Sequence, residues 1–245
     1  MKHLKYLYGL ILIALLAPAC DEDPCLKSTG AMVIDRREIT SDSIALLELI
    51  DDLDVEIYYS DKNYLEVVGG EHLVSYVKSY DKNHVLELVN ENSCQFLRNF
   101  DQELKVKLYL NSLIQIKYNG TGNVEFKDQW KVRDFRFIAE SGSGSIKLWL
   151  DTYSTGINID DGNVDVTCTG VSRHFSVYTA GSSQVLAPNF DCVYGGVWHD
   201  SSADCVVAIT DSIECTLESL GNVILTKDPF VTIHRQDGKG RVVKF

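Results

Sequence analysis

A glycine recurs about every twenty residues along the C-terminal half of this 245-residue chain, and that period limits the possible folds more than any other feature. Successive intervals are 22, 18, 19, 40 and 19 residues, and the interval of double length has Asp204 near its middle. Such a period is typical of a solenoid of short strands in which each coil packs only on its neighbours. The glycines that mark the predicted corners are Gly122, Gly144, Gly162, Gly181, Gly221 and Gly240.

Apolar residues recur at fixed distances from these glycines in the sequence. At five of the six, a β-branched residue follows two positions later, and Val206 does the same after Asp204; Gly181 departs, with Val185 four positions on. We expect each such residue to stack inward on its equivalent in the next coil, about 4.8 Å away, and each corner glycine to adopt a positive φ. The residues are Val124, Ile146, Val164, Val223 and Val242, and a second apolar pair recurs as Phe135/Phe137, Ile157/Ile159, Phe175/Val177 and Val231/Ile233.

The first half of the chain alternates apolar and polar side chains with a period of two, which predicts half-buried strands. Residues 60–63 (SDKN) and 80–83 (YDKN) have the composition of hairpin turns. Residues 41–53 (SDSIALLELIDDL) fit either a capped helix or a strand-loop-strand entry. The predicted fold is therefore all-β, a solenoid with coils of about twenty residues preceded by short strands. The strands are DVEIYYS (54–60), YLEVVGG (64–70), LVSYVKS (73–79), HVLELVN (84–90) and ELKVKLYL (103–110).

The N-terminus has the order of a secretory signal peptide, which we assign to residues 1–19: a basic head, a short apolar run and small residues. The apolar run is shorter than the ~20 residues of a membrane-spanning helix, although a retained anchor is the alternative. The small residues before Cys20 resemble a bacterial lipobox, which implies a lipidated Cys20, a tether over residues 20–32, and membrane attachment. The acidic residues 21–23 resemble a surface-export signal in some bacteria and an inner-membrane retention signal in others. We expect an exported outer-membrane lipoprotein, periplasmic or surface-exposed.

The charge and the cysteines of the chain limit the classes of partner and ligand that it can bind. The net charge is −12, and loss of Lys2 and Lys5 with the leader leaves 21 basic and 35 acidic side chains, a net −14. Such a chain repels phosphate backbones, which argues against nucleic-acid binding. The alternation around Cys168 and Cys215 predicts that both are small buried hydrophobes. No cysteine pair has zinc-site spacing and no nucleotide-binding loop occurs, so no metal or cofactor is expected. A disulfide between Cys25 and Cys94 is one of fifteen pairings open to the six remaining cysteines.

Triplets of glycine, asparagine and a β-branched residue resemble the signature of the head-GIN domain family, the auto-transporter adhesins of Gram-negative bacteria. The resemblance extends over roughly residues 35–245, within a predicted domain of 33–245, and departs from the usual pattern at residues 111–113, where a proline is common. It implies a right-handed β-helix or β-roll and an exported envelope role, and it carries no catalytic residue. The triplets are Gly122-Asn123-Val124, Gly156-Ile157-Asn158, Gly162-Asn163-Val164 and Gly221-Asn222-Val223.

Two functions fit these features. Trp149 and Tyr178 alternate with inward residues and should point outward, where aromatic rings could bind a glycan or a protein partner. We therefore expect a non-enzymatic adhesion or interaction module, of unknown oligomeric state. The alternative is a polysaccharide lyase or hydrolase, because β-helices host such enzymes. Adjacent strand residues point to opposite faces, however, so no neighbouring pair converges on a substrate by itself. The pairs that could supply acid, base or sugar contacts are Asp160-Asp161, Arg173-His174, His199-Asp200 and His234-Arg235.

Overall fold

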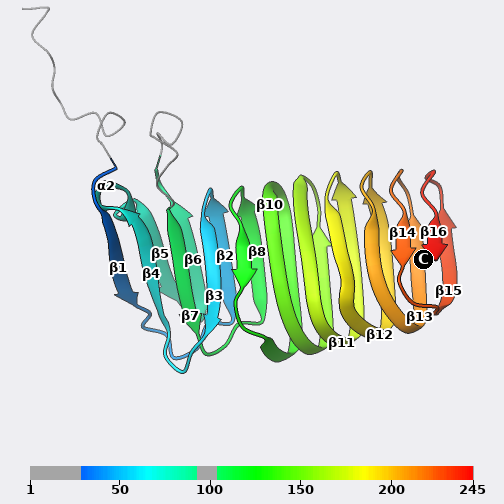
Figure 1. Ribbon diagram of the computed structural model, residues 1–245, viewed down its shortest axis with the longest axis horizontal. Coiled ribbons are helices and arrows are strands. Elements are labelled where there is room, and N and C mark those ends of the chain that lie inside the picture. Colours follow the sequence, from blue (N-terminus) through cyan, green and yellow to red (C-terminus); the bar gives the residue numbers. More distant parts are fainter. Residues whose placement is uncertain (1–28, 93–103, 245) are drawn as a thin grey trace, which may run out of the picture.

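The computed structural model describes residues 29–92 and 104–244, which form a β-solenoid of about six turns (Figure 1). The all-β solenoid predicted from the glycine period is confirmed. Cys20, Cys25, Cys94 and the predicted leader lie outside the described residues. Within these residues, no helix is both long and apolar enough to cross a membrane.

Sixteen strands and one short helix make up the fold. Several strands are long because they continue around a corner, as in the 30 residues of β10. The elements are β1 (Met32–Glu38), β2 (Leu46–Asp51), β3 (Asp54–Tyr59), β4 (Tyr64–Gly70), α2 (Glu71–Val74), β5 (Val77–Lys82), β6 (Val85–Asn90), β7 (Lys105–Leu110), β8 (Gln115–Gly120), β9 (Val124–Phe126), β10 (Trp130–Ile159), β11 (Asn163–Gly181), β12 (Gln184–Ser201), β13 (Cys205–Leu217), β14 (Val223–Leu225), β15 (Phe230–Gln236) and β16 (Val242–Lys244).

Each coil has two straight sides, and each side stacks in parallel on the same side of the next coil. We call the A side the face that contains residues 143–151 of β10 and 163–171 of β11, which are paired in register. The B side contains residues 154–159 of β10 and 174–179 of β11, also paired in register. Strands β12, β13 and β15 extend the B side, and β12, β13, β14 and β16 extend the A side.

Inward side chains form continuous columns, as predicted, but two positions in the pattern are wrong. Cys205 takes the inward place while Val206 is half-buried, because Asp204 aligns with Asn222 of the next coil rather than with Gly221. Val164 is buried but pairs with Gly144, so that Val166 occupies the column. The main A-side column is Val55, Val124, Ile146, Val166, Val185, Cys205, Val223 and Val242.

The corner glycines are required for two different reasons. Gly162 has φ +107°, and a Cβ there would also collide with the backbone of Gly142 in the preceding coil. Positive φ values likewise occur at Gly144 and Gly181, but the prediction is wrong for the other three corner glycines. At Gly221 the conformation is ordinary, and the collision of a Cβ with the Ala203 carbonyl oxygen alone excludes a side chain. Close stacking of coil backbones therefore explains glycine at positions where φ does not; the corners without positive φ are Gly122, Gly221 and Gly240.

The asparagine of the triplet joins neighbouring coils. The backbone N and Nδ2 of Asn222 donate to Oδ1 of Asp204, at 2.8 and 3.1 Å, and its own Oδ1 accepts from the backbone N of Arg241 at 3.0 Å. Asn123 donates in the same way to Asp54, at 2.7 and 2.9 Å. At Gly122 and Gly221 the triplet is thus a structural device: the glycine permits close stacking, the asparagine links the corners, and the β-branched residue enters the core. Gly156-Ile157-Asn158 differs, because it lies on a straight B side rather than at a corner.

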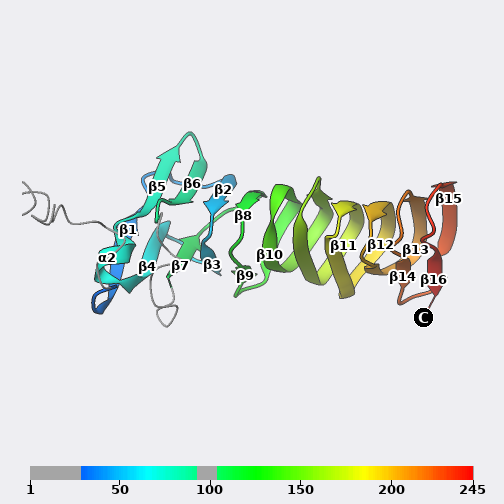
Figure 2. The ribbon, with the colours of Figure 1, turned by 90° about the horizontal axis from the view of Figure 1, so that it is seen from above.

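The N-terminal end closes the solenoid with strands that do not follow sequence order. β2 and β3 lie between the coil formed by β6 and β7 and the coil formed by β8 and β9. β1 and β4 run antiparallel to their neighbours, as does β5 beside β6 (Figure 2). Residues 46–51 of the ambiguous segment form strand β2, which settles it as the strand-loop-strand alternative.

Only one of the two predicted hairpins forms. Residues 83–84 join β5 and β6, and Asn83 and His84 both have positive φ, as a two-residue type I′ turn requires. Residues 60–63 connect β3 to β4, but β7 lies between these strands, so that prediction is wrong. The predicted strand 73–79 is also partly wrong, because α2 continues to Val74 and β5 begins at Val77.

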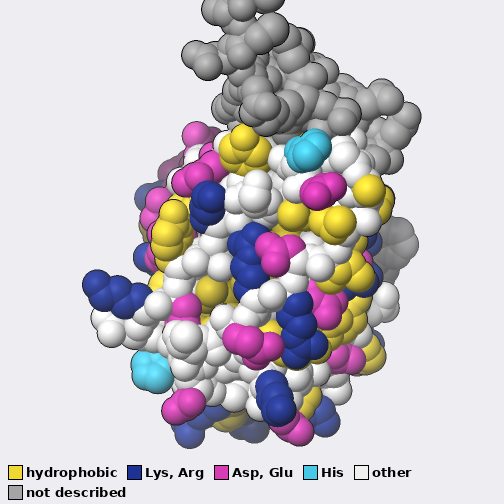
Figure 3. Space-filling view, turned by 90° about the vertical axis from the view of Figure 1, so that its left-hand side faces the viewer, with side chains coloured by type: hydrophobic (Ala, Val, Ile, Leu, Met, Phe, Trp, Pro, Cys, Tyr) yellow, Lys and Arg dark blue, Asp and Glu magenta, His cyan; other side chains and the backbone are white. Residues whose placement is uncertain are grey.

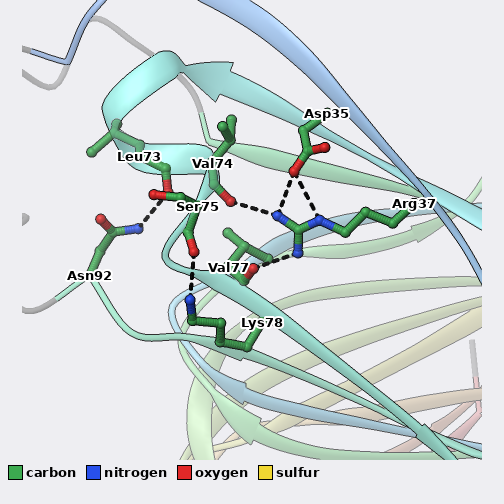
Figure 4. Close-up of polar contacts among 8 residues, drawn as sticks. All are labelled: Asp35, Arg37, Leu73, Val74, Ser75, Val77, Lys78 and Asn92. Atoms are coloured by element: carbon green, nitrogen blue, oxygen red, sulfur yellow. Dashed lines mark hydrogen bonds and ion pairs between the residues drawn. The ribbon is translucent and has the colours of Figure 1, made fainter.

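Arg37 ties this N-terminal end together. Its guanidinium contacts Asp35 on the same strand at 2.7 Å and donates to the carbonyl oxygens of Val74 and Val77 at 2.8 and 2.6 Å (Figure 4). β1 is thereby fixed to α2 and β5. The outer surface of this end carries interspersed basic and acidic side chains (Figure 3).

Candidate binding face

The B side of β10, β11 and β12 carries a floor of small residues across successive coils. Gly156 pairs with Ser176, and Ser176 pairs with Gly196, so the three lie in one outward column. A Cβ built on Gly196 would meet nothing within 4 Å. The face is therefore hollowed along the solenoid axis.

One wall of this hollow is aromatic. Asn158, Tyr178 and Trp198 form the adjacent column, in register on the same three coils. The rings of Tyr178 and Trp198 pack edge to face, with centroids 5.7 Å apart. Trp198 is 50% exposed, and its Nε1 donates to Oε2 of Glu218 at 3.0 Å, which fixes the ring.

The opposite wall is a second row of rings. His174 lies between Tyr153 and Tyr194, with ring centroids 5.1 Å from each. Arg133 and Arg173 lie over the two tyrosine rings, at 5.4 and 5.6 Å from the centroids. We call the floor and both walls the B-face groove, and its residues are Tyr153, Gly156, Asn158, His174, Ser176, Tyr178, Tyr194, Gly196 and Trp198.

The N-terminal part of the groove contains a hollow of about 400 Å³. The Arg136 side chain borders the floor, because a Cβ on Gly156 would lie 3.8 Å from its Cγ. A further hollow of about 510 Å³ lies at a corner beside Trp130 and Tyr59. The residues lining the groove hollow are Arg136, Phe137, Ile138, Gly156, Ile157, Asn158, Ser176, Val177 and Tyr178.

The two predicted ligand-facing aromatics lie on different faces. Tyr178 points outward and belongs to the B-face groove. Trp149 also points outward, with 44% exposure, but it lies on the A side opposite Thr169. Sequence reasoning missed Trp198, although it follows the inward Val197 and lies twenty residues after Tyr178, where the period would have placed it.

The candidate catalytic pairs do not assemble into one site. Asp160 and Asp161 are exposed at a corner, where Asp161 Oδ1 accepts from the backbone N of Gly162 at 2.7 Å. His234 Nε2 lies 3.2 Å from Oε2 of Glu214, and the neighbouring Arg235 instead contacts Glu218. These residues therefore serve corners and coil-to-coil contacts.

His199 lies inside the solenoid rather than on its surface. It is 0% exposed, and neither ring nitrogen makes a hydrogen bond of normal geometry with a described residue. Burial lowers the pKa of His199, and the Ala203 backbone, Asp204 and Asp200 offset this only in part. The pair His199-Asp200 cannot act on a substrate in this arrangement, because the imidazole is enclosed by the core.

The cysteines that the structure describes are core residues. Cys168 and Cys215 are buried and unbridged, as predicted for small hydrophobes, and so are Cys192 and Cys205. Burial raises the pKa of the Cys215 thiol to about 12 and raises that of Cys168 as well. Thiols in this state are poor nucleophiles and poor metal ligands. In residues 29–92 and 104–244, no three His, Cys, Asp or Glu side chains cluster as a metal site would require.

The sequence profile of the family described as "Putative auto-transporter adhesin, head GIN domain" matches residues 46–229. The chain belongs to this head-GIN family. The matched region runs from β2 to the loop before β15, so it includes every coil of the B-face groove. No curated protein matches the sequence significantly.

Several solved structures have a fold similar to that of this chain. A "putative adhesin" from Bacteroides fragilis NCTC 9343 superposes with a TM-score of 0.78 at 15% identity, over 88% of this chain and 97% of that chain. A "putative adhesin" from Parabacteroides merdae ATCC 43184 gives 0.58 at 17%, over 90% and 98%. A "putative lipid binding protein" from Parabacteroides distasonis ATCC 8503 gives 0.63 at 18%, over 89% and 98%. At these identities the likeness establishes the fold alone.

Proposed function

We propose that this head-GIN chain is an exported, lipid-anchored envelope protein whose solenoid is a non-enzymatic module for adhesion or interaction. The B-face groove is its ligand-binding surface. The observation that carries the proposal is the pair of aromatic rows in register on either side of a floor of glycine and serine. Exposed rings on a rigid sheet offer apolar contact area at a small cost in conformational entropy.

The composition of the groove supports a binding role over a hydrolytic one. Most glycoside hydrolases use two carboxyl groups that flank the scissile bond. The nine residues that line the groove hollow include neither Asp nor Glu. The carboxylates that contact groove residues are held in hydrogen bonds, Asp160 with Asn158 and Glu218 with Trp198, which favours binding over cleavage.

The leader in the sequence and the position of β1 support the proposed anchor. Residues 1–19 would be removed, Cys20 lipidated, and residues 20–32 would tether the domain to the outer membrane, on its periplasmic or external side. Two or three acyl chains give stable attachment where one gives only marginal binding. β1 lies at one end of the solenoid, and the coils of the groove extend away from it (Figure 1), an arrangement that presents the groove away from the anchor.

Metabolic labelling with an alkyne fatty acid tests the anchor. We expect label on the full chain expressed in a Gram-negative host and none on Cys20→Ala. The matched control Cys25→Ala should keep its label, because only the first residue of the mature chain is acylated. Label that persists on Cys20→Ala would refute lipidation at this position.

Attachment of cells that display the full chain tests the groove. Trp198→Ala cells should adhere less than wild type to immobilised mucin or matrix protein, whereas Trp149→Ala cells should adhere normally. The two tryptophans have similar exposure, 50% and 44%, but lie on different faces. Equal losses from the two variants, or none from either, would rule out the groove as the adhesive surface.

A further inference from the structure

The backbone of the groove is already fully engaged between coils. Residues 174–179 pair with 154–159 on one side, and residues 174–181 pair with 194–201 on the other. An extended peptide that binds by strand addition needs an unpaired sheet edge, and this face offers none. A ligand of this face therefore binds through the outward side chains rather than by strand addition.

The rings define the direction of such a ligand. Tyr178 and Trp198 occupy successive coils, as do His174 and Tyr194, so contacts repeat along the solenoid axis at the spacing of strands, about 4.8 Å. The floor between the rows offers only the hydroxyl of Ser176 and bare glycine. A narrow chain of repeating units laid along the axis can contact both rows.

The charges around the groove favour an anion, although the chain as a whole carries −12. Arg136 and Arg173 form no ion pair with any residue that the structure describes, and His174 lies between the tyrosine rings of the same wall. Arg133 is paired with Asp134 at 3.6 Å but remains 82% exposed.

The carboxylates near the groove have partners of their own. Asp134 is 3.6 Å from Arg133, and Asp160 accepts a hydrogen bond from Nδ2 of Asn158 at 2.8 Å. Glu214 is 3.2 Å from His234, and Glu218 contacts Arg235. Arg136, beside the N-terminal hollow, and Arg173, over the Tyr194 ring, are therefore the guanidinium groups of the groove that are left for a ligand. A guanidinium binds carboxylate or sulfate groups in preference to neutral hydroxyls.

We propose that the B-face groove binds an anionic polysaccharide, a glycan chain with carboxylate or sulfate groups, laid along the solenoid axis. Sugar rings stack on Tyr178, Trp198 and the opposite row of rings. Arg136 and Arg173 contact the acidic groups. This inference rests on the proposed adhesive function and names its ligand class.

Binding of the purified full chain to immobilised polygalacturonate, chondroitin sulfate and neutral dextran tests the inference. Both anionic chains should bind, more weakly as the ionic strength rises, and dextran should not. Trp198→Ala and Arg136→Gln should each lower the affinity about tenfold. Gly196→Gln should block the floor without harming the fold, because the space above Gly196 is empty. The A-side controls Trp149→Ala and Lys147→Gln should bind as wild type.

Four results would overturn the inference. Equal binding to dextran would show that charge does not select the ligand. Equal losses of affinity in the A-side and B-side variants would show that the groove is not the binding site. Binding to immobilised matrix proteins but to no polysaccharide would refute the glycan while leaving the adhesive function intact. Failure to bind either protein or polysaccharide would refute both.

Discussion

The N-terminal end and the coils from β10 to β13 are both stacks of strands, but the order of the strands in the stack follows the sequence only in the later coils. In the later coils each neighbour is the next turn of the chain, so Asn222 bonds to Asp204, 18 residues away. At the N-terminal end the same contact joins Asn123 to Asp54, 69 residues away. The equivalence of the two contacts shows that the corner chemistry is independent of chain order. The twenty-residue period, by contrast, is visible only where successive turns are neighbours.

The largest effect should come from the stacked coils. Gly162→Val places a branched side chain at φ +107° and against the Gly142 backbone, and we expect a loss of about 3 kcal/mol in the free energy of unfolding. Urea denaturation followed by circular dichroism measures this. Gly196→Ala is the control, because its methyl group would meet nothing within 4 Å and should be nearly neutral. Similar losses at both glycines would contradict the stacking explanation.

A smaller effect is expected at the N-terminal end. Arg37→Ala leaves the carbonyl oxygens of Val74 and Val77 without their guanidinium donor, at a cost of about 2 kcal/mol. Hydrogen exchange measured by mass spectrometry should accelerate in β1 and α2 and stay unchanged in β11 and β12. Arg133→Ala, at an 82% exposed side chain, should alter neither. Faster exchange throughout the chain would show that the two regions unfold together.

The asparagine contacts that join the corners of neighbouring coils allow a direct comparison of the two regions. Asn123→Ala and Asn222→Ala should each cost about 1 kcal/mol, because each removes equivalent side-chain contacts between coils. Thermal unfolding of the two variants measures the costs, with Asn189→Ala, at an exposed strand position, as control. A much larger loss at Asn123 would mean that its contact with Asp54, which is distant in sequence, stabilises the fold more than the equivalent contact between Asn222 and Asp204.

The smallest effect at neutral pH concerns titration, and the two regions should respond in different pH ranges. Burial lowers the pKa of His199, so the unfolded chain binds its proton first and stability falls as the pH drops below about 6.5. At the N-terminal end, burial would raise the pKa of Asp81, but hydrogen bonds from Ser41 and Thr40 hold it below its usual value. That contribution is lost only below about pH 4.

His199→Leu separates these two titrations. The variant should remove the loss of stability between pH 7 and about pH 5 and change stability at pH 7 by less than about 1 kcal/mol. Leucine suits the site because Leu217 occupies the same inward column on the next coil. Thermal unfolding across pH, with Asp81→Asn as the matched variant, measures both. An unchanged pH profile in His199→Leu would contradict its role.

The sequence predicted the coils well because each glycine, asparagine and β-branched residue there has a local physical reason. It placed Val206 wrongly because Asp204 looks like the glycine of a corner but occupies the place of the triplet's asparagine. It could not place β2 and β3 between coils that come later in the chain. Strands that pair across such a long stretch of sequence produce no regular spacing of residues.

The groove was predictable only in part. Alternation identified Tyr178 as outward, and the same rule applied one period later would have identified Trp198. Alternation alone does not distinguish the two sides of a coil, so it grouped Trp149 with Tyr178 although they lie on different faces. The floor of small residues was not predicted either, because Gly156 and Gly196 are not among the glycines of the twenty-residue period.

The most direct test of the central claim is ¹⁹F NMR of the full chain labelled with 5-fluorotryptophan and titrated with polygalacturonate. The chain has three tryptophans: Trp198 in the groove, Trp149 on the A side and Trp130 in the core. We predict that the Trp198 resonance shifts while the other two stay in place. A shift confined to Trp149, or no shift of Trp198 at saturation, would contradict the assignment of the B-face groove as the binding surface.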